Sequence, residues 1–242
     1  MCNREANPPP GELAVPEAAR GVVIFAHGSG SSRFSVRNRY VAGQLRGEGL
    51  GTLLLDLLTG AEEEQPGCRF DLDLLAGRLR QATEWVRGQW LTQALPVAYF
   101  GASTGAAAAL LAAAEPDSAV YAVVSRGGRP DLVGNTLGLV RAPTLLLVGS
   151  RDEAVLAGNR RALRKLNAQS TLEIVEGARH LFPEPGALEE VARLAGAWLV
   201  AHLPAGARGG ARREGTGPQE GGCEATGLGS VTLGWRRGRG VR

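Results

Sequence analysis

Runs of consecutive apolar residues recur between residues 21 and 175, and polar, glycine-bearing segments separate them. A strand that is covered on both faces carries continuous Val, Leu and Ile rather than an alternation of apolar and polar residues. We therefore predict a set of buried strands. They lie at residues 21–26, 52–57, 97–100, 120–124, 143–149 and 171–175.

The segments between these runs repeat apolar residues at helical spacing, as in residues 72–86. Strands that alternate with helices form a parallel sheet through right-handed crossovers. The pattern predicts an α/β fold, with a mostly parallel central sheet of about six to seven strands and helices on both faces. Helices are expected at about residues 36–46, 72–86, 106–114, 154–166 and 187–203, a short edge strand at residues 13–15, and an acidic loop at residues 62–70.

The chain divides into three parts by composition. Residues 1–20 are polar and contain proline, which predicts an N-terminal extension, and residues 21–203 form one predicted domain. The linker between Pro130 and Pro143 is too short for a cap domain. Residues 204–242 contain 12 Gly and show no periodicity, so we expect a disordered Gly/Arg-rich tail.

The net charge of +3 does not alter the predicted fold or domain division, because the excess positive charge lies in the tail. Residues 204–242 hold seven Arg and three Glu, a net charge of +4, which leaves the rest of the chain at −1. This distribution argues against a nucleic-acid partner. We find no apolar stretch long enough for a membrane span and no signal-peptide pattern, and we expect a cytoplasmic protein. A homodimer is left open.

One segment, residues 97–106, runs from an apolar strand through a serine into an alanine-rich helix. A serine at such a turn has a strained backbone, and strand and helix pass so close that the flanking positions need small residues. Gly101 and Gly105 meet this need around Ser103. The Gly-x-Ser-x-Gly pattern alone is weak evidence in a chain with 35 Gly, so its context must support it.

Several polar residues directly follow predicted strands. Because sites in parallel sheets lie at the carboxyl ends of the strands, we expect these side chains to gather along one edge. They are His27, Ser103, Ser125, Asp152 and His180. A serine nucleophile needs a base to take its proton and a carboxylate to orient that base. The order Ser, Asp, His along the chain is the one that a nucleophile-elbow sheet uses.

With these motifs, the chain resembles the α/β-hydrolase family over residues 21–203. The matching segments are His27-Gly28-Ser29-Gly30, Gly101-Ala102-Ser103-Thr104-Gly105, Gly149-Ser150-Arg151-Asp152 and residues 177–180. More narrowly, it is similar to small lidless bacterial hydrolases of the dienelactone-hydrolase-like group, some of which are fused to phosphoribosyltransferases. Two departures stand out. Dienelactone hydrolase proper uses a cysteine nucleophile, and this chain has no acid pair that opens a phosphate loop after a strand.

The resemblance implies a role for each matching residue. Ser103 is the nucleophile, His180 the general base and acid, and Asp152 the orienting carboxylate. The oxyanion hole consists of the backbone N–H groups of Ser29 and Thr104. The implied enzyme is a serine esterase that needs no metal and no cofactor, and it acts on a small-molecule carboxylic ester, lactone or related acyl compound. A catalytically silent binding module and an acyltransferase remain open as alternatives.

Other residues compete for these roles. Asp56 follows the second predicted strand and rivals Asp152, which could instead cap the next helix. His27 precedes the glycine loop and reads as a structural residue, and His202 lies in the last turn of a helix. Ser103 could simply occupy a tight turn.

Arginines near the predicted edge suggest a further feature of the site. Arg33, Arg126 and Arg129, with Arg37 and Arg39, lie on loops or helix starts there and could select an anionic acyl or phosphate-bearing substrate. The chain has 26 Arg and one Lys, so a general arginine bias weakens this inference.

Overall fold

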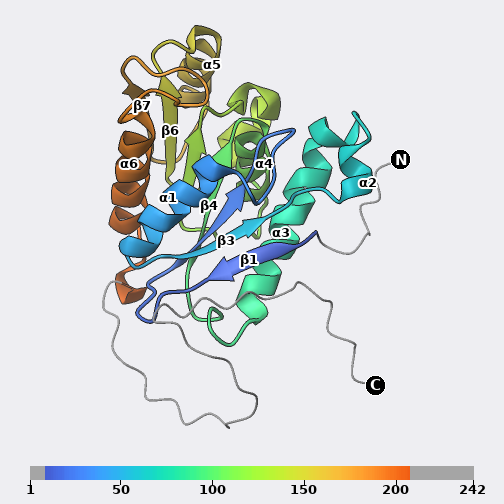
Figure 1. Ribbon diagram of the computed structural model, residues 1–242, viewed down its shortest axis with the longest axis vertical. Helices are drawn as coiled ribbons and strands as arrows, with labels where there is room; N and C mark the ends of the chain where they lie inside the picture. Colours follow the sequence, from blue (N-terminus) through green and yellow to red (C-terminus); the bar gives the residue numbers. More distant parts are fainter. Residues whose placement is uncertain (1–8, 208–242) are drawn as a thin grey trace.

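The computed structural model describes residues 9–207, which form a twisted sheet between two layers of helices (Figure 1). The sheet has seven strands in the order β1-β3-β2-β4-β5-β6-β7. All neighbouring pairs are parallel except β1 and β3, which are antiparallel. The predicted α/β-hydrolase architecture is confirmed.

Each predicted apolar run overlaps one strand, and the expected edge strand overlaps β1 (Gly11–Ala14). The others are β2 (Val22–Ala26), β3 (Gly51–Leu55), β4 (Val97–Ala102), β5 (Val123–Arg126), β6 (Thr144–Gly149) and β7 (Ser170–Val175). Every residue of β2 through β6 is buried, as continuous apolar runs predict. Most of β7 is only half-buried, because it forms the second edge of the sheet.

The helices divide between the two faces of the sheet. On one face, α1 (Val36–Gly47) packs against α6 (Ala187–Ala201). On the other lie α3 (Leu72–Gly88), α4 (Thr104–Ala113) and α5 (Glu153–Leu163). Successive strand residues point to opposite faces, so alternate residues of each strand join the two core layers.

The acidic loop expected at residues 62–70 is wrong in detail. A short helix, α2 (Gly60–Glu63), and a 3-10 turn, η1 (Cys68–Phe70), occupy this region. Thr59 and Glu62 form a capping box that starts α2. The Glu62 carboxylate is buried and lies 3.0 Å from a guanidinium nitrogen of Arg78, with side-chain exposures of 6% and 1%. A carboxylate expected in solvent is thus a buried ion-pair partner.

Within residues 9–207, no cap domain covers the sheet. The segment between β5 and β6 is a kinked 3-10 stretch, η2 (Pro130–Leu139), which packs on α4 and α5. After α6 the chain forms a 3-10 turn, η3 (Ala205–Ala207). The rest of the predicted tail, residues 208–242, lies outside the described residues, as do residues 1–8. Within residues 9–207, no helix is long and apolar enough to cross a membrane.

Candidate active site

Ser103 lies at the sharp turn between β4 and α4 with φ 51° and ψ −120°. A non-glycine residue with positive φ is strained, and such strain gathers at functional sites. A Cβ atom on Gly101 would lie 2.4 Å from the Ala106 Cα, and one on Gly105 would lie 2.3 Å from the Ala26 carbonyl oxygen. Glycine is therefore required on both sides of Ser103 so that α4 can pack tightly on β2 and β4.

The loop after β5 connects the surroundings of Ser103 with those of His180. The Ser103 N–H donates to the Arg126 carbonyl at 3.1 Å, and the Arg129 N–H donates to the Ser103 carbonyl at 3.2 Å. Gly127, with φ 52°, lies against the imidazole: a Cβ there would be 3.4 Å from His180 Nδ1. The backbone of residues 126–129 therefore contacts both the serine and the histidine.

His180 and Asp152 form a hydrogen-bonded pair. The Nδ1 atom of His180 lies 2.6 Å from Asp152 Oδ2, and their side-chain exposures are 38% and 15%. Asp152 precedes α5, but its side chain makes no capping hydrogen bond. Gly149 lets the His180 loop approach, because a Cβ there would lie 2.2 Å from the Ala178 carbonyl oxygen. The carboxylate accepts a hydrogen bond from the Nδ1–H group and leaves Nε2 as the proton acceptor.

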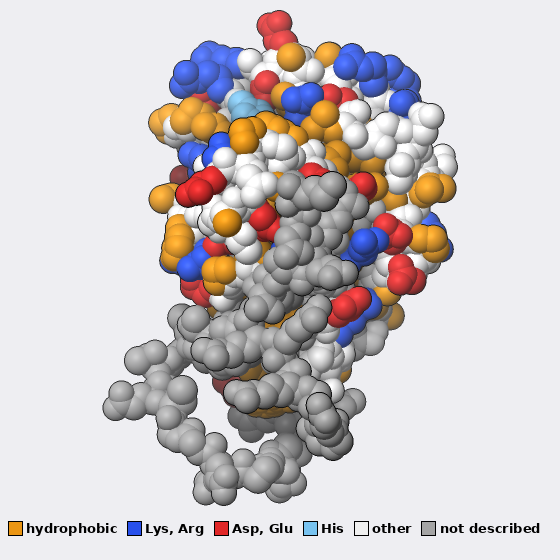
Figure 2. Space-filling model, turned by 90° about the vertical axis from the view of Figure 1, so that its right-hand side faces the viewer, with side chains coloured by type: hydrophobic (Ala, Val, Ile, Leu, Met, Phe, Trp, Pro, Cys, Tyr) orange, Lys and Arg blue, Asp and Glu red, His pale blue; other side chains and the backbone are white. Residues whose placement is uncertain are grey.

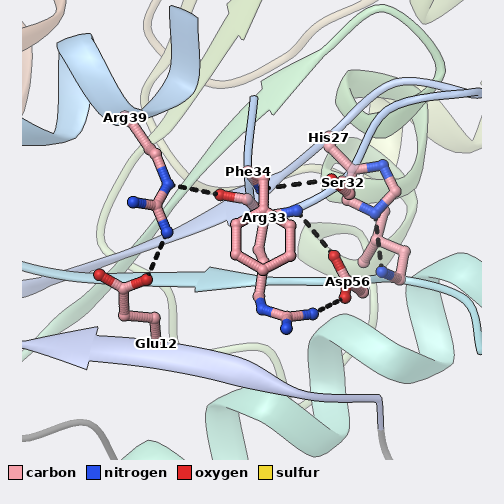
Figure 3. Close-up of polar contacts among 8 residues, drawn as sticks. Glu12, His27, Ser32, Arg33, Phe34, Arg39 and Asp56 are labelled. Carbon is pink, nitrogen blue, oxygen red and sulfur yellow. Dashed lines mark hydrogen bonds and ion pairs between the residues drawn. The ribbon is translucent and has the colours of Figure 1, made fainter. Parts of the chain in front are cut away.

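Asp56, the other carboxylate weighed for this role, is bound elsewhere. It accepts a hydrogen bond from the Arg33 backbone N–H at 2.7 Å and forms an ion pair with the Arg33 guanidinium (Figure 3). The structure thus places Asp152, and not Asp56, against the histidine of the His180 loop.

His27 has both ring nitrogens engaged with the backbone, and Figure 3 draws one of the two contacts. Its Nε2 accepts the Leu57 N–H at 2.9 Å, so Nδ1 carries the proton and donates it to the Gly28 carbonyl at 2.9 Å. The residue is only 4% exposed. His202 is the C-cap residue of α6, and its Nδ1 lies 2.8 Å from the Trp198 carbonyl oxygen.

The two residues predicted for the oxyanion hole contact each other. The Ser29 N–H donates to Thr104 Oγ1 at 2.8 Å. Thr104 is the first residue of α4, where a backbone N–H has no acceptor within the helix. Gly28 passes close to the nucleophile: a Cβ there would lie 3.1 Å from Ser103 Cβ. The Ser29 amide is therefore engaged within the chain, which sequence reasoning did not foresee.

Basic side chains lie on both sides of a histidine at the top of the molecule, the end that α5 occupies (Figures 1 and 2). The three arginines predicted to bind substrate differ in their surroundings. Arg33 is paired with Asp56, and Arg129 binds both carboxylate oxygens of Asp131 at 2.8 and 2.7 Å. This pairing raises the pKa of Arg129 and lowers that of Asp131.

Arg126 is buried and contacts no carboxylate among the hydrogen bonds and ion pairs of residues 9–207. Its Nη2 donates to Asn38 Oδ1 at 3.3 Å. Burial, and to a lesser extent the positive charge of Arg37, lowers the pKa of Arg126 to about 10. The sequence did not single out Asn38, and no motif marks it. Among residues 9–207, no group of His, Cys, Asp and Glu side chains is arranged to hold a metal ion.

No family model matches the chain. Two Mycobacterium tuberculosis proteins, from strains CDC 1551 / Oshkosh and H37Rv, are each 59% identical to it over 196 residues and carry the name phosphoribosyl transferase. The match covers 81% of this chain and 44% of each relative, so the chain spans less than half the length of these relatives.

Solved structures match over most of their length. A dienelactone hydrolase from Anabaena variabilis is 55% identical, with a TM-score of 0.78, and the match covers 80% of this chain and 92% of that one. Est1E from Butyrivibrio proteoclasticus has a TM-score of 0.69 at 15% identity, covering 80% of this chain and 93% of that one. At this identity Est1E shows a shared fold alone.

Proposed function

Because the chain belongs to the dienelactone-hydrolase-like family of α/β-fold hydrolases, we propose that it is a serine hydrolase of a carboxylic ester, lactone or related acyl compound. The observation that carries this proposal is the His180–Asp152 pair, at 2.6 Å, beside the loop that contacts the strained Ser103. A nucleophile, a base and an orienting carboxylate are the groups that acyl transfer through serine requires.

In the proposed reaction, Ser103 Oγ attacks the acyl carbon while its proton passes to His180 Nε2. The carbonyl π electrons move to oxygen and form a tetrahedral oxyanion. Collapse of this intermediate breaks the bond to the leaving oxygen, which takes the proton from His180. Water then attacks the acyl-enzyme, gives a proton to His180, and the second collapse releases the acid and returns the proton to Ser103.

Asp152 acts on the base and not on the substrate. Its carboxylate accepts a hydrogen bond from Nδ1–H, so the imidazole keeps Nε2 available, and it stabilises the imidazolium that forms during attack. For the oxyanion we propose the Thr104 N–H, at the start of α4, as the first donor. The Ser29 N–H is the second, and it must share or release its bond to Thr104 Oγ1 when the oxyanion forms.

The name of the mycobacterial relatives does not transfer to this chain. They are more than twice as long as the segment matched here. The described hydrolase fold also offers no acid pair that opens a phosphate loop after a strand, the feature expected of a phosphoribosyltransferase. We therefore assign only the hydrolase chemistry to residues 21–203.

The test is covalent labelling of the purified chain by a fluorophosphonate, with a screen of short and medium p-nitrophenyl esters and lactones. Labelling and hydrolysis that both disappear in Ser103→Ala are expected. Absence of both in the wild-type chain would support a catalytically silent module. Adding a primary alcohol to the assay tests acyl transfer, because transfer yields the alcohol's ester in place of the free acid.

A further inference from the structure

The Arg126 guanidinium is buried and has no carboxylate partner among residues 9–207. Arg126 is the last residue of β5, and the carbonyl of the same residue accepts the Ser103 N–H. The side chain is 6% exposed, and its Nη1 atom is buried with no hydrogen-bond partner. Burying an unpaired charge is costly, so a site that keeps one calls for an explanation.

A second arginine lies close to it. Arg37, half-buried in the first turn of α1, has a buried Nε atom with no partner. Its positive charge contributes to the lowered pKa of Arg126, which means that the two cations repel each other. Neither forms an ion pair with a carboxylate of residues 9–207.

Three other arginines at this end of the sheet are compensated. Arg33 is paired with Asp56, Arg129 with Asp131, and Arg39 with Glu12 at 2.6 Å. Arg126 and Arg37 differ from these three neighbours, because neither has an acidic partner among residues 9–207.

The start of α1 adds further positive potential. Ser35 caps this helix of 12 residues, and its Oγ accepts the Asn38 N–H at 3.4 Å. The first turn of α1 contains no acidic residue. Asn38 also accepts the hydrogen bond from Arg126 Nη2, so the buried guanidinium lies at the positive end of the helix dipole.

We propose that Arg126, Arg37 and the first turn of α1 form a subsite for a phosphate group on the acyl substrate. The assignment rests on the proposed hydrolase function and names its substrate class, a phosphate-bearing ester or acyl compound. Two uncompensated guanidinium charges and a helix N-terminus match a phosphate monoester, which carries almost two negative charges at neutral pH. A carboxylate would leave one of the two positive charges uncompensated.

The backbone of the same segment contacts the proposed reacting residues. Arg126 is joined to Ser103 through its carbonyl, and the next residue, Gly127, contacts the His180 ring. A phosphate bound by the guanidinium groups of Arg126 and Arg37 would anchor one end of the substrate while its acyl carbon meets Ser103.

The experiment measures inorganic phosphate binding by calorimetry to the full chain, with acetate at equal ionic strength as the carboxylate probe. Arg126→Met and Arg37→Gln should each weaken phosphate binding by about tenfold to a hundredfold, the effect of losing a charge-assisted hydrogen bond. The matched control is Arg193→Gln, an exposed arginine of α6 that is paired with Glu190. It should bind phosphate as the wild type does. Any binding to the arginines of residues 208–242 contributes equally to all measurements, because every variant keeps them.

Circular dichroism and melting temperature report whether each variant is folded. If Arg126→Met does not fold, the half-exposed Arg37→Gln decides the question alone. Phosphate should also raise the KM for p-nitrophenyl acetate without changing kcat, because it would occupy part of the substrate site. Failure of the proposed function would appear as absence of ester hydrolysis, whereas the calorimetric comparison decides the subsite independently.

Three results would overturn the proposal. Phosphate affinity that is unchanged in both variants excludes these arginines as the binding groups. Acetate that binds as tightly as phosphate replaces the phosphate assignment by a carboxylate one. Phosphate that binds through Arg126 and leaves the KM for p-nitrophenyl acetate unaltered would place the subsite outside the substrate site.

Discussion

His27 and His180 both follow parallel strands at the same edge of the sheet, yet their surroundings suit them to different tasks. The ring of His27 is buried, and both of its nitrogens bond to backbone groups of neighbouring loops. The ring of His180 bonds to a carboxylate through Nδ1 and is partly exposed. A position at a strand end brings a histidine to the site, but only a nitrogen left available by its neighbours can exchange a proton with a substrate.

Asp56 and Asp152, the acids near His27 and His180, differ in the same way. Asp56, near His27, bonds to the backbone and guanidinium of Arg33 and so fixes the loop after β2. Asp152 bonds to His180, and its side chain caps no helix. The region around Asp56 holds the loop that passes Ser103, and the region around Asp152 serves proton transfer in the mechanism that we propose.

The largest effect is expected from removing the proposed reacting groups. Ser103→Ala and His180→Ala should each lower kcat by about four to six orders of magnitude, and the double variant should be little worse than either. Initial rates on the best ester of the screen measure this, with melting temperature as the control for folding. A His180→Ala enzyme of normal rate would contradict the contrast between the two histidines.

The next effect separates the two carboxylates. Asp152→Asn should lower kcat by about four orders of magnitude or less, because the base remains and only its orientation and charge support are lost. Asp56→Asn keeps the Asp152–His180 pair intact and serves as the matched variant. We expect its kcat to fall far less, and the opposite ranking would make Asp56 the orienting carboxylate.

A third prediction concerns stability. His27→Ala leaves the buried Leu57 N–H and Gly28 carbonyl without their side-chain partner, which should cost about 2–4 kcal/mol of unfolding free energy. Urea unfolding monitored by circular dichroism measures the loss. His180→Ala, at a partly exposed position, is the comparison and should change stability much less. Equal losses in the two variants would argue against the structural role of His27.

The smallest expected effect is that of Thr104→Val. The substitution removes the hydroxyl that accepts the Ser29 N–H and keeps the shape of the side chain and the backbone N–H of residue 104. Stability should fall by about 1 kcal/mol, the net contribution of one hydrogen bond, and kcat by about tenfold or less. A loss of kcat as large as that of Ser103→Ala would mean that the Thr104 hydroxyl takes part in the reaction itself.

Much of the fold was predictable because the signals that specify it are local. Continuous apolar runs predicted strands β2 to β7, since strands covered on both faces, as β2 to β6 are, consist mostly of apolar residues. The capping box of Thr59 and Glu62 is an equally local signal, although the prediction for residues 62–70 was a loop. The placement of Gly101 and Gly105 around Ser103 is also largely a local signal. Gly101 is required by a contact with α4, which follows it directly in the chain, and only Gly105 is required by a contact with the more distant end of β2.

Local signals along the chain thus specified the sheet, the elbow and the set of polar residues that follow the strands. How those residues pair depended on the packing of the loops. The fold joined Asp152 to His180 and Asp56 to Arg33, and it buried Arg126 without an ion pair to a carboxylate of residues 9–207. Hydrogen bonds and charge pairs act over a few ångströms between residues that are far apart in the chain. The partner of a given Asp, His or Arg is therefore fixed only when the loops pack together.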